Sequence, residues 1–226
     1  MIYSCLAGCM GYAIVDDDAH PTAAQIVVGD FCFFAGKPSE TLAAQAAAPI
    51  LAPQNEAWCR VIEHVWGNRV VRHTRYAIKK EPGVFNGSKL SLFASSLPLE
   101  YTLVPINETI YGQAAQEQWS KDLVSQFPDG ADYCLRGLGV AVLCNGQLVA
   151  GASYYTIYPG GIEIEIDTKP DYRGLGLATA CGAALMLECL RRGLYPSWDA
   201  HDLRSATLAQ KLGYHLDHPY LVYMKL

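Results

Sequence analysis

The residues best suited to chemistry lie in the run Tyr172-Arg173-Gly174-Leu175-Gly176-Leu177-Ala178-Thr179. This run follows a strand-like segment, 162–167, and opens a long apolar segment that ends near Arg192. A strand, a short glycine-bearing loop and a helix N-terminus together present free backbone N–H groups and the positive end of a helix dipole. The sequence therefore predicts a site for a ligand that carries phosphate groups.

The spacing of the small residues decides between classes of phosphorylated ligand. The dinucleotide fingerprint GxGxxG requires a third small residue five positions after the first, and counted from Gly174 that position is Thr179. This disfavours a nucleotide-binding oxidoreductase. Read as Arg-x-x-Gly-x-Ala, with Arg173, Gly176 and Ala178 in the fixed places, the run resembles the pyrophosphate loop of the GNAT superfamily of acyl-CoA-dependent N-acyltransferases. An ordinary junction between a loop and a helix is the alternative explanation.

A second motif follows in the order expected for that superfamily. An extended run, 195–200, leads into a helical segment, 202–214, that ends on Lys-Leu-Gly-Tyr, and a strand-like segment, 220–225, follows. This is similar to the last third of the superfamily, where Asn-x-x-Ser opens the helix. Two positions depart from it, because Asp202 replaces the usual asparagine and Ala209 replaces the tyrosine that often serves as general acid. The identity of the acid stays open.

The resemblance implies acetyl-CoA as the acyl donor and assigns residues to it. The pantetheine arm is implied to lie along Ile166, Asp167 and Thr168, and Ser205 to lie near the far end of the cofactor. The diphosphate is assigned to Arg173, Gly174, Leu175, Gly176, Leu177, Ala178 and Thr179.

Three carboxylates alternate with isoleucines in the strand before the loop. Period-two alternation places Glu163, Glu165 and Asp167 on one face of this strand. A solvated face is one explanation, and a carboxylate that accepts a proton from an attacking amine is the other. Mutual repulsion can raise one pKa into a useful range. We predict Glu165 as the base or amine-binding carboxylate.

Other residues are weaker candidates. Tyr214 and Tyr223 could supply the acid but are equally explained as core aromatics. Trp198, Asp199 and His201 lie where the acceptor would meet the strand after the helix.

Upstream segments complete the order expected for a GNAT core. A strand begins at Tyr101, a helix is predicted over 108–127, and strands over 140–144 and 147–153 flank Asn-Gly, a dipeptide suited to a type I′ turn. A second reversal at 159–161 feeds the 162–167 strand. The predicted fold is α/β with a mixed sheet, with a GNAT fold in the C-terminal half.

The first hundred residues contain no comparable phosphate loop. Strands are predicted over 11–15, 25–34 and 70–79, and helices over 40–48 and 56–66. Pro98 and nearby serines suggest a boundary, giving a smaller α/β domain over 1–98 and the acetyltransferase domain over 99–226. The segment 29–36 resembles the N-terminal region of a bacterial GNAT subfamily that includes the zwittermicin-resistance acetyltransferase.

Composition limits the alternatives. The chain has 226 residues, of which 51% are hydrophobic and 17% charged, so it can bury a substantial core. A net charge of −5 without basic runs argues against nucleic acid as a main partner. No apolar stretch reaches membrane-spanning length, and no signal peptide is recognisable. Eight cysteines without CxxC spacing and six scattered histidines predict a reducing cytoplasm and no metal site. A homodimer is neither indicated nor excluded.

These observations predict an N-acetyltransferase that moves an acetyl group from acetyl-CoA to a primary amine of a small molecule by direct attack with general-base assistance. Residues 1–98 would form a wall of the acceptor pocket. The alternative is a non-catalytic acyl-CoA-binding or sensory module, which the missing tyrosine at Ala209 motivates.

Overall fold

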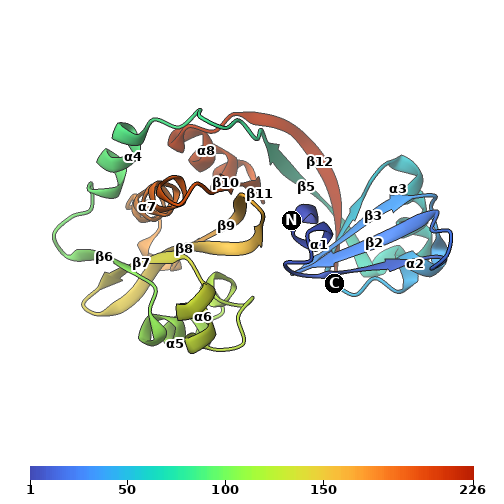
Figure 1. Cartoon of the computed structure of the whole chain (residues 1–226), viewed down its shortest axis with the longest axis horizontal. Coiled ribbons are helices and arrows are strands. Elements are labelled where there is room, and N and C mark those ends of the chain that lie inside the picture. The colour runs from blue at the N-terminus through green and yellow to red at the C-terminus, as the bar shows by residue number, and fades with distance from the viewer. The chain divides into compact units, whose positions relative to one another are not determined.

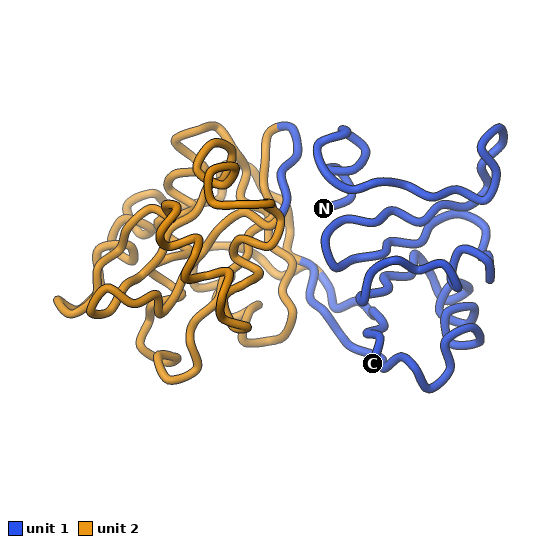
Figure 2. Tube along the Cα trace, turned by 90° about the horizontal axis from the view of Figure 1, so that it is seen from below, with its two compact units in different colours: residues 1–77, 156–159, 218–226 blue, residues 78–155, 160–217 orange.

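The computed structural model describes all 226 residues, which form two compact units (Figure 2). Unit 1 comprises residues 1–77, 156–159 and 218–226, and unit 2 comprises 78–155 and 160–217. Three of the boundaries between units fall within strands, those over 70–78, 147–158 and 216–225, and the last residues of the chain return to the first unit. The division into domains at residue 98 stays a prediction about which segments fold independently.

Unit 1 supplies most of a seven-stranded sheet with the strand order β1-β2-β3-β4-β12-β5-β11, in which β11 (Asp199–Ala200) is the one strand that lies wholly in unit 2. The first three strands are antiparallel, β4 is parallel to β3, and β12 is antiparallel to β4. Its core includes Phe34, Leu51, Trp58, Ile62 and Tyr223, all at most 2% exposed. Its elements are α1 (Ile2–Leu6), β1 (Tyr12–Val15), β2 (Ala23–Val28), β3 (Phe31–Gly36), α2 (Glu40–Ala44), β4 (Ile50–Pro53), α3 (Glu56–Trp66), η1 (Gly67–Arg69), β5 (Val70–Ile78) and β12 (Leu216–Lys225).

Two predictions for this unit are wrong in detail. The single strand predicted over 25–34 is a hairpin, because Gly29 adopts a φ of 54° and reverses the chain between β2 and β3. The helix predicted over 40–48 ends at Ala44. The helix over 56–66 is confirmed, and Asn55 caps it by accepting a hydrogen bond from the Trp58 N–H.

Unit 2 is built on a second sheet, with the order β10-β9-β8-β7-β6. In Figure 1, α7 and α4 cover one face of this sheet, and α5 and α6 lie on the other. Its elements are α4 (Gly87–Ala94), β6 (Tyr101–Pro105), α5 (Glu108–Gln116), η2 (Lys121–Leu123), α6 (Gly130–Arg136), β7 (Gly139–Cys144), β8 (Gln147–Tyr158, whose last residues belong to unit 1), β9 (Gly161–Thr168), η3 (Pro170–Tyr172), α7 (Leu177–Arg191), β10 (Tyr195–Ser197), β11 (Asp199–Ala200) and α8 (Leu203–Leu212). The α/β class with a mixed sheet is confirmed.

The predicted turn between β7 and β8 is also confirmed. Asn145 and Gly146 both have positive φ values, 50° and 76°, as a type I′ turn requires. The helix predicted over 108–127 is wrong beyond Gln116. Glu117 leaves the helix in an extended conformation, with φ −106° and ψ 135°, and a short 3₁₀ turn and α6 follow.

The two units repeat one chain order. In each, three successive strands joined by short turns are followed by a helix, a strand parallel to the third one, and another helix. Only the second copy has a long helix after its third strand: α7 has 15 residues, whereas α2 has five. The copies therefore share an arrangement but not a phosphate loop.

Candidate functional site

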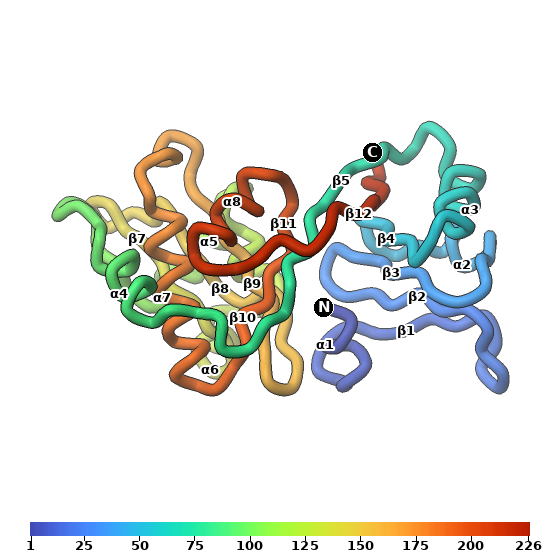
Figure 3. Tube along the Cα trace, turned by 90° about the horizontal axis from the view of Figure 1, so that it is seen from above, coloured from blue at the N-terminus to red at the C-terminus, as the bar shows by residue number.

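The carboxyl-terminal half of β9 has a bare edge. β10 is parallel to β9 but pairs only with its first three residues, since the register ends at Ser197 opposite Glu163, whereas β9 continues to Thr168. Figure 3 follows these two strands from above. The Tyr195 N–H donates to the Gly160 carbonyl, so even-numbered residues of β9 direct their backbone groups toward β10.

Three residues consequently point N–H and C=O groups at the edge that β10 leaves uncovered. By alternation these are Ile164, Ile166 and Thr168, while Lys169 faces the other way and donates to the Val149 carbonyl of β8. Of the three residues assigned to the pantetheine arm, Ile166 and Thr168 lie on the bare edge, and the backbone of Asp167 points toward β8. An extended chain with amide groups fits such an edge as an added strand.

The Thr168 side chain adds a second unsatisfied group at the same place. Its Oγ1 is buried and has no hydrogen-bond partner. A buried hydroxyl without a partner is costly, so a ligand atom that reached it would recover that free energy.

The loop after β9 is shaped by two glycines. Gly174 and Gly176 have φ values of 79° and 81°, in the left-handed region that other residues rarely adopt. Gly176 is the N-cap of α7 and provides no side-chain cap, so the first N–H groups of this helix, from Leu177, Ala178 and Thr179, are open to a ligand. The loop is exposed, which suits an anion-binding helix terminus.

Two more of the predicted loop residues can be placed. Leu175 is exposed, and the Arg173 Nε donates to the Thr168 carbonyl at 3.3 Å, which links the loop to the end of β9.

The opposite faces of β9 differ in chemistry, as the alternation predicts. Ile166 lies against α7, since a Cβ on Gly182 would be 3.1 Å from its Cδ1. On the other face, Glu165 and Asp167 share a side-chain hydrogen bond. Burial, followed by the negative charge of Asp122, raises the pKa of Asp167 from its usual 3.8 to about 7. The Asp167 carboxyl group therefore retains its proton up to near neutral pH.

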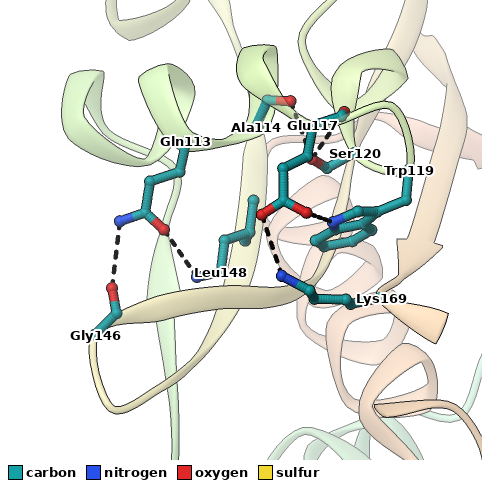
Figure 4. A network of polar contacts seen from close by, with 8 residues as sticks. All are labelled: Gln113, Ala114, Glu117, Trp119, Ser120, Gly146, Leu148 and Lys169. Carbon is teal, nitrogen blue, oxygen red and sulfur yellow. Dashed lines mark hydrogen bonds and ion pairs between the residues drawn. The ribbon is translucent and has the colours of Figure 1, made fainter. Parts of the chain in front are cut away.

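The segment that carries Asp122 is held in place by a polar network, drawn in Figure 4. Glu117 accepts from the Lys169 Nζ at 3.1 Å and from the Trp119 Nε1 at 2.6 Å, and the Ser120 Oγ donates to the Ala114 carbonyl at 2.9 Å. Lys169 immediately follows β9, so this ion pair joins the segment to the strand whose carboxylates it faces.

A second tie fixes α5. Gln113 donates from Nε2 to the Gly146 carbonyl at 3.2 Å and accepts from the Leu148 N–H at 2.8 Å. Asp122, Glu117 and Lys169 were not predicted as site residues, because each partner is distant in the sequence and no short motif joins them.

Ser205 and Asp202 lie at the start of α8. Asp202 replaces asparagine without loss of the cap, since its Oδ1 accepts from the Ser205 N–H at 2.9 Å. The Ser205 Oγ accepts a hydrogen bond from the Trp198 Nε1 at 3.0 Å. Ala209 is fully buried and provides no acid.

Both tyrosines that were considered as the general acid make hydrogen bonds within the protein. The Tyr214 hydroxyl is buried and donates to the Pro196 carbonyl at 2.6 Å, and Tyr223 belongs to unit 1, where it donates to Glu63. Trp198 is 7% exposed, and His201 is exposed. Burial also raises the pKa of Glu163.

The mixed α/β fold is that of acetyltransferases of the GNAT class. The chain belongs to the GNAT acetyltransferase family, whose sequence model matches residues 1–223. GNAT enzymes generally use acetyl-CoA and act on small-molecule or amine acceptors. The two sheets are consistent with a tandem GNAT-like arrangement.

Several known proteins are similar to this chain. An uncharacterized N-acetyltransferase of Bacillus subtilis, YdfB, is 28% identical over 182 residues, which cover 76% of this chain and 64% of that protein, so the match spans less than two thirds of its length. A GCN5-related N-acetyltransferase-like protein of Streptococcus suis is 46% identical with a TM-score of 0.95, over 100% of this chain and 92% of that one. A GCN5-related N-acetyltransferase of Kribbella flavida, 16% identical with a TM-score of 0.60 over 99% and 93%, shows the fold alone.

None of the helices combines the length and the apolar character needed to cross a membrane.

Proposed function

We propose that this protein transfers an acetyl group from acetyl-CoA to a primary amine of a small molecule. One observation carries the proposal: the bare edge of β9 leads through a glycine loop into the uncapped N-terminus of α7. An added strand and an anion site in direct succession match a ligand that joins an amide-bearing arm to a diphosphate.

The residues present fit that ligand. Backbone groups of Ile166 and Thr168 would hold the amides of the arm, and the buried Thr168 hydroxyl gives the arm one further partner. The N–H groups after Gly176 would hold the diphosphate, with Arg173 beside them. The thioester of acetyl-CoA supplies an electrophilic carbonyl carbon.

Glu165 is proposed as the general base. A protonated amine cannot attack, so Glu165 accepts a proton from the ammonium nitrogen, directly or through a water molecule. The freed lone pair then forms the C–N bond while the C–S bond breaks and its electron pair stays on sulfur. The nitrogen, positively charged after the attack, releases its second proton to water and becomes a neutral amide. Asp167 shares the hydrogen bond with Glu165 and tunes the pH at which this base is available.

No tyrosine protonates the leaving sulfur in this proposal, because Ala209 occupies that position. A thiol has a pKa of about 8.5, so the thiolate leaves readily and takes its proton from water. The consequence is a reaction that depends on the base more than on an acid.

The acceptor is proposed to be cationic. Asp122, Glu165 and Asp167 lie on one side of β9 and would attract an amine that carries further positive charge, such as a polyamine or an amino antibiotic. The second of these classes agrees with the resemblance of 29–36 to the subfamily of the zwittermicin-resistance enzyme. We further propose that residues 1–98 form a wall of the acceptor pocket and that the protein is cytoplasmic.

The proposal is tested by following release of free CoA thiol from acetyl-CoA across a broad panel of amines, with mass spectrometry of each product. We expect at least one cationic amine to be acetylated, and Glu165→Gln to lower kcat about 100-fold, within the usual range for general-base catalysis. Glu100→Gln, the same change at an exposed residue, serves as control. Tight binding of acetyl-CoA with no turnover of any amine would favour the non-catalytic module instead.

A further inference from the structure

Trp119 presents an aromatic ring that has neither an aromatic nor a cationic partner. The chain has four tryptophans, and a ring–ring or cation–π contact forms on each of them except Trp119. The partners on the other rings are Phe34 on Trp58, Tyr214 on Trp198, and Arg69 and Lys225 on Trp66. Because Trp119 is partly exposed, a ligand can reach this unused ring.

The ring is held in a fixed position by its polar edge. The Trp119 Nε1 donates to Oε2 of Glu117 at 2.6 Å, and the other carboxylate oxygen of Glu117 accepts from the Lys169 Nζ at 3.1 Å (Figure 4). The next residue, Ser120, is buried and donates from its backbone N–H to the Glu117 carbonyl at 3.1 Å. A side chain that is fixed before the ligand arrives loses little conformational entropy on binding.

Trp119 lies on the acidic side of the proposed site. Asp122 follows it by three residues, in η2, and η2 packs against β9. Glu165 and Asp167 project from β9 on the face opposite Ile166, which is the face where α5 and α6 lie in Figure 1. The segment that carries Trp119 comes directly after α5. The ring therefore belongs to the face from which an acceptor amine would reach Glu165.

The lysines of this segment do not occupy the ring. The Lys169 ammonium is paired with Glu117, and Lys121 is exposed. Neither makes a cation–π contact with Trp119, although such contacts form on Trp66. A cationic group of a ligand would therefore meet a π-system that carries no cation of the protein, close to carboxyl groups that attract it.

We propose that Trp119 selects acceptors that carry a second cationic group, by a cation–π contact with that group while the primary amine is acetylated. This inference rests on the proposed function. Tryptophan binds cations better than the other aromatic side chains, and quaternary ammonium groups are typical ligands of such rings. Asp122 attracts any cationic amine, whereas the ring adds affinity only for a cation that reaches it. The distance between the two nitrogens of the acceptor therefore becomes a determinant of specificity.

The test compares an aminoalkyl trimethylammonium with its carbon isostere, in which a tert-butyl group replaces the trimethylammonium group, over a series of alkyl chain lengths. Both compounds keep the primary amine and nearly the same shape, so they differ in the second charge alone. Calorimetric titration of the protein measures binding without turnover. At the best chain length, the wild type is expected to bind the charged compound about tenfold more tightly than the isostere, through the cation–π contact and the nearby carboxyl groups together.

Substitutions at Trp119 separate the ring from the carboxyl groups. Trp119→Leu is expected to lower the preference for the charged compound about fivefold, and Trp119→Phe to lower it less, because phenylalanine keeps a weaker π-system without the indole N–H. The affinity for the carbon isostere should stay nearly unchanged. Phe93→Leu, the loss of another partly exposed ring on α4, should leave the preference intact, since α4 lies on the opposite face of the sheet.

The outcomes distinguish this inference from the proposed function. An equal preference in the wild type and in Trp119→Leu would overturn the role of the ring, and so would equal affinity of the wild type for both compounds. Equal weakening of both compounds in Trp119→Leu would also overturn it, because the residue would then act through the fold. Release of CoA thiol from acetyl-CoA with the same amines tests acetyl transfer separately. A preference that depends on Trp119, without turnover of any amine, would support the cation site and overturn the acetyl transfer.

Discussion

At the scale of residues, Asp167 is the most informative group. Its pKa is raised to about 7 by burial and by the charge of Asp122. Strand alternation alone does not distinguish it from Glu163 and Glu165, which lie on the same face of β9. The sequence predicted that three carboxylates share a face and that their mutual repulsion raises the pKa of one of them. It could not indicate which one, because the charge of Asp122 arrives from a segment more than forty residues away.

The raised pKa predicts a pH-dependent cost to stability. A carboxyl whose pKa is higher in the folded state loses stability as pH rises from its unfolded value, near 4, to its folded value, near 7. Asp167→Asn removes this term, so it should be more stable than the wild type by about 2–4 kcal/mol near pH 8, and close to equal near pH 4. Urea unfolding of both proteins at the two pH values measures it, with Asp171→Asn as the exposed control. A difference that does not change with pH would contradict the assignment.

The same pair predicts a pH profile of activity. Glu165 must be ionised to accept a proton, and the negative charge of Asp167 opposes that ionisation. The rise of kcat/KM with pH that marks ionisation of Glu165 should therefore move to lower pH in Asp167→Asn, which carries no charge at that position. A profile that is identical in both proteins would show that Asp167 does not act on the base.

At the scale of elements, the sequence predicted β9, the glycine loop and α7 well, since alternation, positive-φ glycines and a long apolar run are local signals. The break after Gln116 could not be predicted, because Glu117 leaves the helix toward Lys169 and Trp119, and the Lys169 contact is non-local. The hairpin at Gly29 was read as one continuous strand for a similar reason: apolar residues run through the turn.

The ion pair of Glu117 with Lys169 predicts a separation of stability from activity. Both side chains are partly exposed, so Lys169→Met should cost under about 1 kcal/mol in unfolding free energy. It should raise the KM for the amine several-fold, because Asp122 is no longer held against β9, while the Kd for acetyl-CoA stays the same. Lys121→Met, on the same segment, is the matched control. An unchanged amine KM would show that the segment needs no such tie.

At the scale of the whole molecule, the repeated chain order was not predicted. The order depends on β4, which the sequence reading did not detect, and on β12, which returns the end of the chain to unit 1. Pairing across such sequence distances leaves no periodic signal in either segment. The loop before α7 could be predicted, because its two glycines, Gly174 and Gly176, are a local signal that is visible in the sequence.

A substitution at Tyr223 tests whether this residue of unit 1 contributes to stability and not to catalysis. It is 1% exposed and donates to Glu63 within unit 1, so Tyr223→Phe should lower the unfolding free energy by about 1.5–3 kcal/mol, as expected for a hydrogen bond to a charged group. Binding of acetyl-CoA and kcat should change less than about twofold, a factor worth only about 0.4 kcal/mol. A large loss of kcat with intact binding would mean that this hydroxyl is the general acid after all.

The most direct measurement of the central claim is calorimetric titration of the purified protein with acetyl-CoA, with NAD and ATP as controls. We predict saturable binding of acetyl-CoA alone. Gly176→Glu should abolish it, since it places a carboxylate at the helix N-cap that would receive the diphosphate, while Gly193→Glu, at another exposed positive-φ glycine beyond the other end of α7, should preserve it. Failure of the folded wild type to bind, or equal binding by Gly176→Glu, would contradict the assignment of this loop to acetyl-CoA.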